Sequence, residues 1–135
     1  LDDELAVFCA PGHHLAGRGR CTVEEALGEV WVVREQGSGT RQTLDRAMSP
    51  HWSRWRIGAE FNQIEAIKSA VAAGSMIGCV SRLSLADAFA CGRLVELEVE
   101  GLELRRRLYI VRRREKFVTE GVRALLALCG APAAD

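Results

Sequence analysis

The junction that decides the fold is residues 30–41, which read VWVVREQGSGTR. The first four residues are β-branched or aromatic and favour a short strand, and the residues from about Thr40 to Met48 have the apolar spacing of a helix. Gly37 and Gly39 allow the chain to turn tightly between the two elements. The stretch therefore predicts a strand, a glycine loop and a helix in succession, the repeating unit of an α/β sheet.

The same junction carries the residues best suited to bind a ligand. The hydroxyls of Ser38 and Thr40 lie near a predicted helix N-terminus, where unpaired N–H groups and the helix dipole favour an anion. The residues leave open a simpler interpretation, in which they only cap the helix. No nucleotide signature fits, because G-x-G-x-x-G would require glycine at Gln42 and the lysine of a P-loop is missing. The hydrolase motif G-x-S-x-G is absent as well, since Gly37 directly precedes Ser38.

Asn62 and Gln63 follow a second predicted strand, residues 56–61, and precede another helix. Ligands of open α/β sheets gather at the carboxyl ends of the strands. Both amide side chains are therefore expected to face the same crevice as Ser38 and Thr40. The alternative is that Asn62 caps the helix, as the first residue of the capping-box pattern NQIE. The two roles are compatible.

Strands alternate with helices along the rest of the chain, which predicts a layered α/β fold with a mostly parallel sheet. Thr22 and Glu25 form a capping-box pattern before a short helix, and Ser81 is expected to cap another. The further strands are expected at residues 4–10, 76–80, 94–97 and 104–112, and the further helices at residues 23–27, 64–74, 82–90 and 118–129.

Two of these segments and one loop carry specific expectations about burial. Residues 108–111, LYIV, are apolar on both faces of the strand, as in a central strand. Trp52 and Trp55 lie in a loop, where they either cover an edge of the core or form an interface. The last helix is expected to turn one face toward the core, formed by Val122, Leu125, Leu126 and Cys129.

Composition narrows the class of protein. The 135 residues contain 18 basic and 18 acidic side chains, so the formal net charge is zero, whereas a DNA-contacting module normally has a basic excess. The five cysteines are odd in number and form no C-x-x-C pair, which favours small buried thiols in a reducing compartment. No apolar run is long enough to cross a membrane, and no signal peptide is visible. A cytoplasmic protein is expected, and the missing initiator Met indicates a piece of a longer one.

Catalytic and metal-binding residues are not expected. His13 and His14 are adjacent, and adjacent side chains do not normally chelate one metal ion well, while His51 is the third and last histidine. No His stands in a known signature with Ser or Cys, so no catalytic residue and no cofactor are predicted. The arginines at residues 105–107 and 112–114 form either a basic patch for DNA or a partner, or a solvated surface.

One ordered set of short motifs runs through nearly the whole chain. It comprises AVFCAPGH (6–13), LAG (15–17), TVEE (22–25), REQGSGTR (34–41), EAIK (65–68), AVAAG (70–74), IG (77–78), SR (81–82), GRL (92–94) and LYIV (108–111). No single motif is specific, but the set resembles the substrate-binding domain of LysR-type transcription regulators. That family usually has Pro at the position of His14 and Gly at that of Met76, so these two positions depart from its pattern.

The resemblance implies a periplasmic-binding-protein-like (type II) α/β fold, in which a mixed sheet is flanked by helices and two subdomains are joined by two crossing strands. About residues 10–100 would form a complete second subdomain. About residues 104–130 would be the return strand and last helix of the first subdomain. The strands at residues 4–10 and 104–112 would be the hinge pair, and most of the first subdomain would lie outside this chain.

The resemblance also implies a function, which is sensing and not enzymatic. A small, anionic effector would bind in the cleft between the subdomains. DNA would be bound only through an N-terminal winged helix-turn-helix that this chain lacks, in a homodimer or homotetramer without contact to a membrane. A periplasmic solute-binding protein of the same fold is the alternative. Carried over by position, the effector-binding residues are Ala10, Gly37, Ser38, Thr40, Asn62 and Gln63.

Overall fold

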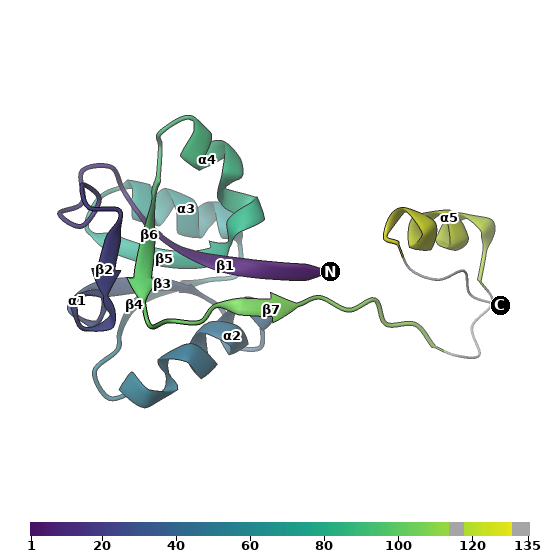
Figure 1. The fold of residues 1–135 in the computed structure, drawn as a ribbon, viewed down its shortest axis with the longest axis horizontal. Helices are drawn as coiled ribbons and strands as arrows, with labels where there is room; N and C mark the ends of the chain where they lie inside the picture. The colour runs from purple at the N-terminus through teal and green to yellow at the C-terminus, as the bar shows by residue number, and fades with distance from the viewer. Residues whose placement is uncertain (114–117, 131–135) are drawn as a thin grey trace.

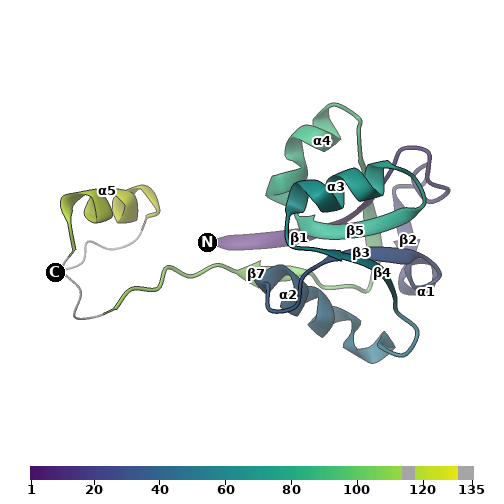
Figure 2. The same cartoon turned by 180° about the vertical axis from the view of Figure 1, so that it is seen from behind.

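The computed structural model describes residues 1–113 and 118–130 and shows one sheet with helices on both of its faces (Figure 1, Figure 2). The strands are β1 (Asp2–Cys9), β2 (Arg20–Thr22), β3 (Val30–Arg34), β4 (Arg56–Phe61), β5 (Met76–Ser81), β6 (Val95–Glu100) and β7 (Arg105–Arg107). The helices are α1 (Val23–Leu27), α2 (Gly39–Met48), α3 (Ile64–Ala72), α4 (Ala86–Ala90) and α5 (Glu120–Leu128), with 3-10 turns at Ser49–His51 and Arg82–Leu85.

The sheet is mixed. The strand order is β2-β6-β1-β5-β3-β4, and β7 pairs with the first residues of β1. β3 is parallel to both β4 and β5, as expected for strands joined by helical crossovers, and β2 is parallel to β6. β1, in contrast, runs antiparallel to β5, β6 and β7. The expectation of a mostly parallel sheet is therefore wrong at β1, and the mixed sheet of the expected fold class is confirmed.

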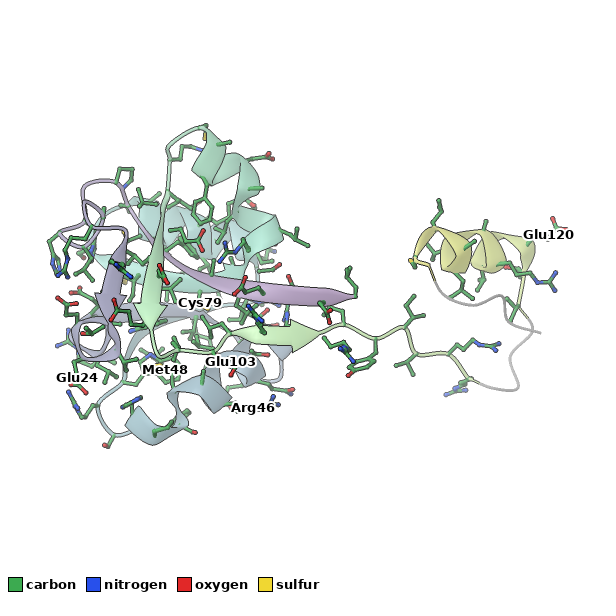
Figure 3. The ribbon with its side chains drawn as sticks, viewed as in Figure 1. Glu24, Arg46, Met48, Cys79, Glu103 and Glu120 are labelled. Atoms are coloured by element: carbon green, nitrogen blue, oxygen red, sulfur yellow. The ribbon has the colours of Figure 1, made fainter. Side chains whose placement is uncertain are left out.

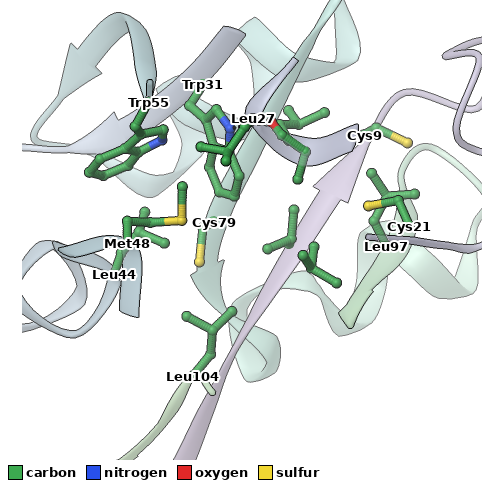
Figure 4. Close-up of a cluster of buried hydrophobic side chains, with 14 of the residues drawn as sticks. Cys9, Cys21, Leu27, Trp31, Leu44, Met48, Trp55, Cys79, Leu97 and Leu104 are labelled. Atoms are coloured by element: carbon green, nitrogen blue, oxygen red, sulfur yellow. Dashed lines mark hydrogen bonds between the residues drawn. The ribbon is translucent and has the colours of Figure 1, made fainter. Parts of the chain in front are cut away.

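Two hydrophobic cores cover the two faces of the sheet, because successive strand residues point to opposite faces. Residues 5–9 of β1 are all buried and alternate between the cores. In the core on the side of α1 and α2, Trp31 and Cys79 of the sheet pack with Leu44 and Met48 of α2 (Figure 4). The core on the side of α3 and α4 consists of Ala6, Phe8, Val32, Ile67, Val71, Val80, Leu85, Ala88 and Leu94.

The predicted capping box at Thr22 is confirmed. The Thr22 hydroxyl accepts a hydrogen bond from the N–H of Glu25 (3.2 Å), and the Glu25 carboxylate accepts one from the N–H of Thr22 (2.9 Å). The capping box predicted to begin at Asn62 is wrong. Helix α3 begins at Ile64, its N-cap is Gln63, and no side chain caps it.

Ser81 has a different role from the one expected. It precedes a 3-10 turn, and its side chain caps no helix. Its hydroxyl instead donates a hydrogen bond to the carboxylate of Asp3 in β1 (2.8 Å). The prediction of a cap is wrong because a buried carboxylate on the neighbouring strand is within reach of the hydroxyl.

The long strand expected at residues 104–112 is much shorter. β7 covers only Arg105–Arg107, which pair with residues 2–4 of β1. Leu1 and Leu108 add two backbone hydrogen bonds (2.8 and 3.1 Å). Residues 109–111 are exposed, because β1 ends its pairing here and no other described strand lies beside them. The prediction of a central strand at residues 108–111 is therefore wrong.

Helix α5 lies apart from the sheet (Figure 1, Figure 2). Thr119 is its N-cap, and its hydroxyl accepts a hydrogen bond from the N–H of Val122 (3.4 Å). Of the four residues expected on its inner face, only Leu126 is buried, while Val122, Leu125 and Cys129 are exposed. The apolar spacing of a helix is present, but the helix does not pack on the sheet of this chain.

The tryptophans and cysteines divide between core and surface. Trp55 covers an edge of the core, where its ring packs edge-on against Trp31 (5.9 Å between centroids), whereas Trp52 remains exposed. Cys9, Cys21 and Cys79 are buried free thiols, as expected, but Cys91 and Cys129 are exposed. Burial raises the pKa of the Cys79 thiol to about 12.

None of the helices in residues 1–113 and 118–130 has both the length and the apolar character needed to cross a membrane.

At Gly78, the backbone of β5 packs closely against the side chains of Phe8 and Val71. A Cβ atom at this position would lie 2.8 Å from Cζ of Phe8 and 2.9 Å from Cγ2 of Val71. Gly78→Ala should lower the free energy of unfolding by about 1–3 kcal/mol, because over-filling a packed core forces side chains out of their preferred rotamers. Urea unfolding followed by tryptophan fluorescence measures the change.

Gly12→Ala is the matched control, since no atom lies within 4 Å of a Cβ built on Gly12. This variant should change the free energy of unfolding by less than about 0.5 kcal/mol. A Gly78→Ala variant as stable as the unsubstituted chain would contradict the tight packing described for β5.

Candidate functional site

Two loops leave the sheet side by side at the edge where β3 and β4 end. The two strands are parallel, and Arg34 is paired with Phe61. The N–H of Glu35 donates a hydrogen bond to the carbonyl of Phe61 (3.1 Å). The carboxyl ends of neighbouring parallel strands lie at one edge of a sheet, where ligands of such folds commonly bind. The fold therefore brings the two predicted junctions to the same edge.

The start of α2 leaves two backbone N–H groups available at this edge. Ser38 is the N-cap, and its hydroxyl oxygen accepts a hydrogen bond from the N–H of Arg41 (3.0 Å). The Ser38 carbonyl accepts from the N–H of Gln42 (3.0 Å). The N–H groups of Gly39 and Thr40 have no acceptor within the helix, because they belong to its first turn. With the helix dipole, these two groups favour an anion, so capping and anion binding are compatible here.

The predicted residues at this edge differ in exposure. Gly37 is exposed and has a φ of +93°, which a glycine adopts without strain. Ser38 is half-buried and Thr40 is buried. Asn62 and Gln63 are exposed, and their side chains form no hydrogen bond with the part of the chain that the structure describes. Their amide groups are therefore available to a ligand at this edge.

Ala10 is the predicted residue that the fold does not bring to this edge. It follows the end of β1, where Leu5 is paired with Ser81 and Phe8 with Gly78. Ala10 therefore lies toward the beginning of β5, whereas the other predicted residues follow the ends of β3 and β4. The cause is the antiparallel direction of β1, whereas a mostly parallel sheet was expected.

Arg41 holds the start of α2 against both strands. Its side chain is only 4% exposed, and it forms ion pairs with Asp45 and Glu60 (2.7 Å each). It also donates a hydrogen bond to the carbonyl of Arg34 at the end of β3 (3.0 Å). Burial alone would lower the pKa of Arg41, but the hydrogen bonds with the two carboxylates outweigh burial and raise the pKa. This side chain fixes where the first turn of α2 lies.

Arg106 reaches the same first turn from β7. Its Nε donates to the carboxylate of Asp3 (2.7 Å), and its Nη1 donates to the hydroxyl of Thr40 (3.0 Å). The Asp3 side chain is 2% exposed and also accepts a hydrogen bond from Ser81 (2.8 Å). Burial alone would raise the pKa of Asp3, but the hydrogen bonds from Ser81 and Arg106 outweigh it and lower the pKa. An ionised Asp3 thus orients the guanidinium.

Sequence reasoning missed Arg106 because it treated residues 105–107 as one patch. Side chains of a strand alternate between its faces, so the middle arginine points away from the other two. Arg105 and Arg107 are exposed, as in the solvated-surface interpretation, whereas the Arg106 side chain is only 18% exposed. Of the second group, Arg112 and Arg113 are exposed, and residue 114 lies outside the described residues.

The two adjacent histidines meet a third potential ligand, Glu29, at the far end of β1. The His14 Nε2 lies 2.6 Å and the His13 Nε2 3.3 Å from the Glu29 carboxylate. The N–H of Leu15 donates to the His13 Nδ1 (3.2 Å), so the proton of a neutral His13 ring is on Nε2 and points at Glu29. A metal ion at that nitrogen would have to displace this proton. We therefore keep the expectation that no metal binds here.

The sequence matches the family model of the LysR substrate binding domain over residues 1–133. The HTH-type transcriptional regulator YeiE of Escherichia coli is 38% identical over 96% of this chain and 44% of its own length. The HTH-type transcriptional regulator CbbR of Rhodospirillum rubrum is 36% identical over 94% of this chain and 42% of its own length. The chain thus spans less than half the length of these relatives.

Solved structures with the same fold include two bound to small molecules. The regulatory domain of Synechocystis CcmR, in complex with 2-PG, has a TM-score of 0.83 and 28% sequence identity, covering all of this chain and 65% of its own. The effector-binding domain of QuiR, in complex with shikimate, has a TM-score of 0.78 over 93% of this chain and 59% of its own. At 17% identity, the second likeness concerns the fold alone.

Arg41→Met should lower the free energy of unfolding by about 2–3 kcal/mol. Removing one partner of a buried ion pair typically costs somewhat more than this, but Asp45 and Glu60 are partly exposed and can be hydrated. Urea unfolding measures the loss.

Arg46→Met is the matched control on the same helix, because Arg46 is exposed (Figure 3) and forms no ion pair with the described residues. It should change the free energy of unfolding by less than about 0.5 kcal/mol. Equal losses in the two variants would show that Arg41 does not fix α2.

Proposed function

Because this chain belongs to the LysR substrate-binding domain family of transcription regulators, we propose that it senses a small organic anion for a DNA-binding regulator. The family and the relatives named above are transcription regulators and not enzymes, in agreement with the sequence analysis. They do not favour the alternative of a periplasmic solute-binding protein. The effector, the DNA and the assembly of the whole protein are parts of the proposal.

The observation that carries the proposal is the geometry at the start of α2. The N–H groups of Gly39 and Thr40 follow the end of β3 next to the Ser38 cap, and Asn62 and Gln63 follow the end of the neighbouring parallel strand β4. Helix N-termini with free N–H groups bind carboxylates and phosphates. We assign Gly37, Ser38, Thr40, Asn62 and Gln63 to the effector site. Ala10 lies at the opposite edge and is left out. CcmR, a protein of known structure that is 28% identical to this chain, was solved with 2-PG.

The proposed division of the chain into two subdomains follows the pairing of its strands. About residues 10–100 form the second subdomain, and about residues 104–130 supply the return strand and last helix of the first. The pair of β1 and β7 is the hinge. The exposed apolar residues 109–111 and the exposed face of α5 suit a first subdomain that would cover them. An effector bound between the subdomains would shift their closure, provided that it binds the closed state more tightly.

The proposed partners follow the same scheme. This chain has no net charge and so lacks the basic excess of a DNA-contacting module; in the proposal, an N-terminal helix-turn-helix of the whole protein binds the DNA. The whole protein is a cytoplasmic homodimer or homotetramer, in which closure of the cleft changes the spacing of the DNA-binding heads.

Ser38→Asp tests the anion site. Aspartate is as good an N-cap as serine, so the helix should remain stable, but its charge would repel an anion from the Gly39 and Thr40 amides. In the unsubstituted chain, inorganic phosphate should shift the NMR signals of these two amides, and Ser38→Asp should weaken this binding at least about tenfold.

Ser49→Asp, at the other end of α2, adds the same charge away from the site and is the control. It should change phosphate affinity less than about twofold, apart from the weak repulsion that salt screens. Phosphate that leaves the Gly39 and Thr40 signals of the unsubstituted chain unmoved would refute the site. So would equal binding by Ser38→Asp.

The coding sequence upstream of Leu1 tests the regulator itself. A helix-turn-helix pattern should stand near the N-terminus of the whole protein, and the purified protein should bind DNA with a strong dependence on salt. A cleavable apolar leader without such a motif would instead make the protein a periplasmic solute-binding protein.

A further inference from the structure

Arg106 lies where the hinge pair meets the start of α2. It belongs to β7, and Arg106 is paired with Asp3 of β1 in the sheet. Its guanidinium spans from the Asp3 carboxylate (2.7 Å) to the Thr40 hydroxyl (3.0 Å). A Cβ atom on Gly39 would lie 3.7 Å from its Nη1, so the charged group also lies against the first residue of the helix.

Most of the hydrogen-bonding capacity of this guanidinium is unused. An arginine has five N–H donors in a rigid fork. One donates to Asp3 and one to Thr40, and the other three have no acceptor among residues 1–113 and 118–130. The side chain is partly exposed, and it lines an open cavity of about 690 Å³ with Arg105, Arg107, Tyr109 and the acidic residues 2–4. A small molecule can therefore reach the free donors.

Arg106 places a positive charge at the N-terminus of α2, a position that favours a negative charge. Helix N-termini carry a partial positive charge and are stabilised by acidic groups, not by cations. The first turn of α2 contains no acidic residue, and a guanidinium stands beside it instead. The buried Asp3 offsets the charge of Arg106 from one side only. The N–H groups of Gly39 and Thr40 and the remaining donors of Arg106 therefore lie next to one another, and both kinds of donor favour an anion.

We propose that Arg106 is the specificity-determining residue of this site, which binds the carboxylate or phosphate of the effector between its guanidinium fork and the N-terminus of α2. This inference rests on the proposed function. It adds the cation that selects the ligand, and it identifies Asp3 as the positioning residue that holds this cation. Because Arg106 is part of the hinge pair, the anion is bound by the strand that joins the two subdomains. A bidentate fork matches two oxygens of one ligand, so the effector carries at least one carboxylate or phosphate group.

A phosphate titration of the 135-residue chain tests the proposal without any substitution. The NMR signal of the Arg106 Nε–H should shift with the Gly39 and Thr40 amide signals and give the same dissociation constant. The Arg106→Lys variant identifies that signal by its disappearance. Signals of Gly39 and Thr40 that shift while the Arg106 signal stays still would overturn the role of Arg106 and leave the anion site of the proposed function intact.

Arg106→Gln should weaken phosphate binding about tenfold, because charge-assisted hydrogen bonds are lost. Arg46→Gln is the matched control. It removes the same charge from an exposed arginine of α2 that does not line this cavity, and it should change the affinity less than about twofold. If the buried Asp3 carboxylate without its partner causes the Arg106→Gln chain to unfold, Arg106→Lys is measured instead. Its phosphate affinity should fall a few-fold, because the charge remains but the guanidinium fork is lost. Equal phosphate affinity in the folded Arg106 and Arg46 variants would overturn the proposal.

Discussion

The rest of the structure depends on β1 and on its direction. It pairs with β5 and β6 through residues 5–9 and with β7 through residues 2–4, so one strand belongs both to the sheet core and to the proposed hinge. Because residues 5–9 are all buried, with side chains in both cores, the register of the strand is fixed, and a slip by one residue would exchange the two faces. The position of Asp3 beside Ser81 and Arg106 follows from that register.

The candidate site is a consequence of this arrangement. β1 is antiparallel to its neighbours, so its first residues lie at the edge where β3 and β5 end. This places the carboxylate of Asp3, and the arginine that it orients, next to the first turn of α2. The structure thereby combines two different sources of positive potential, a helix N-terminus and a guanidinium. A buried arginine of α2, Arg41, holds the helix in place through ion pairs with Asp45 in the same helix and Glu60 in β4.

Local patterns predicted the elements well. The glycines before α2, the cap at Thr22 and the β-branched run of β3 all lie in elements that local interactions determine. Contacts between distant segments were not predictable in this way. Because β1 is antiparallel to β5, Ala10 lies at the opposite edge from the other predicted site residues. Ser81 donates a hydrogen bond to the Asp3 carboxylate and does not cap a helix. Arg106 was missed because the alternation within β7 was not applied. The apolar residues 108–111 and the face of α5 were expected to be buried, and the described residues of this chain contain nothing that covers them.

In the proposed site, an anionic effector binds between the start of α2 and Arg106. The most direct test is a crystal structure of the whole regulator with the effector that changes its DNA binding. We expect a carboxylate or phosphate of that effector within hydrogen-bonding distance of the Gly39 and Thr40 N–H groups and of the Arg106 guanidinium. An effector bound elsewhere, with the guanidinium still joined only to Asp3 and Thr40, would contradict it.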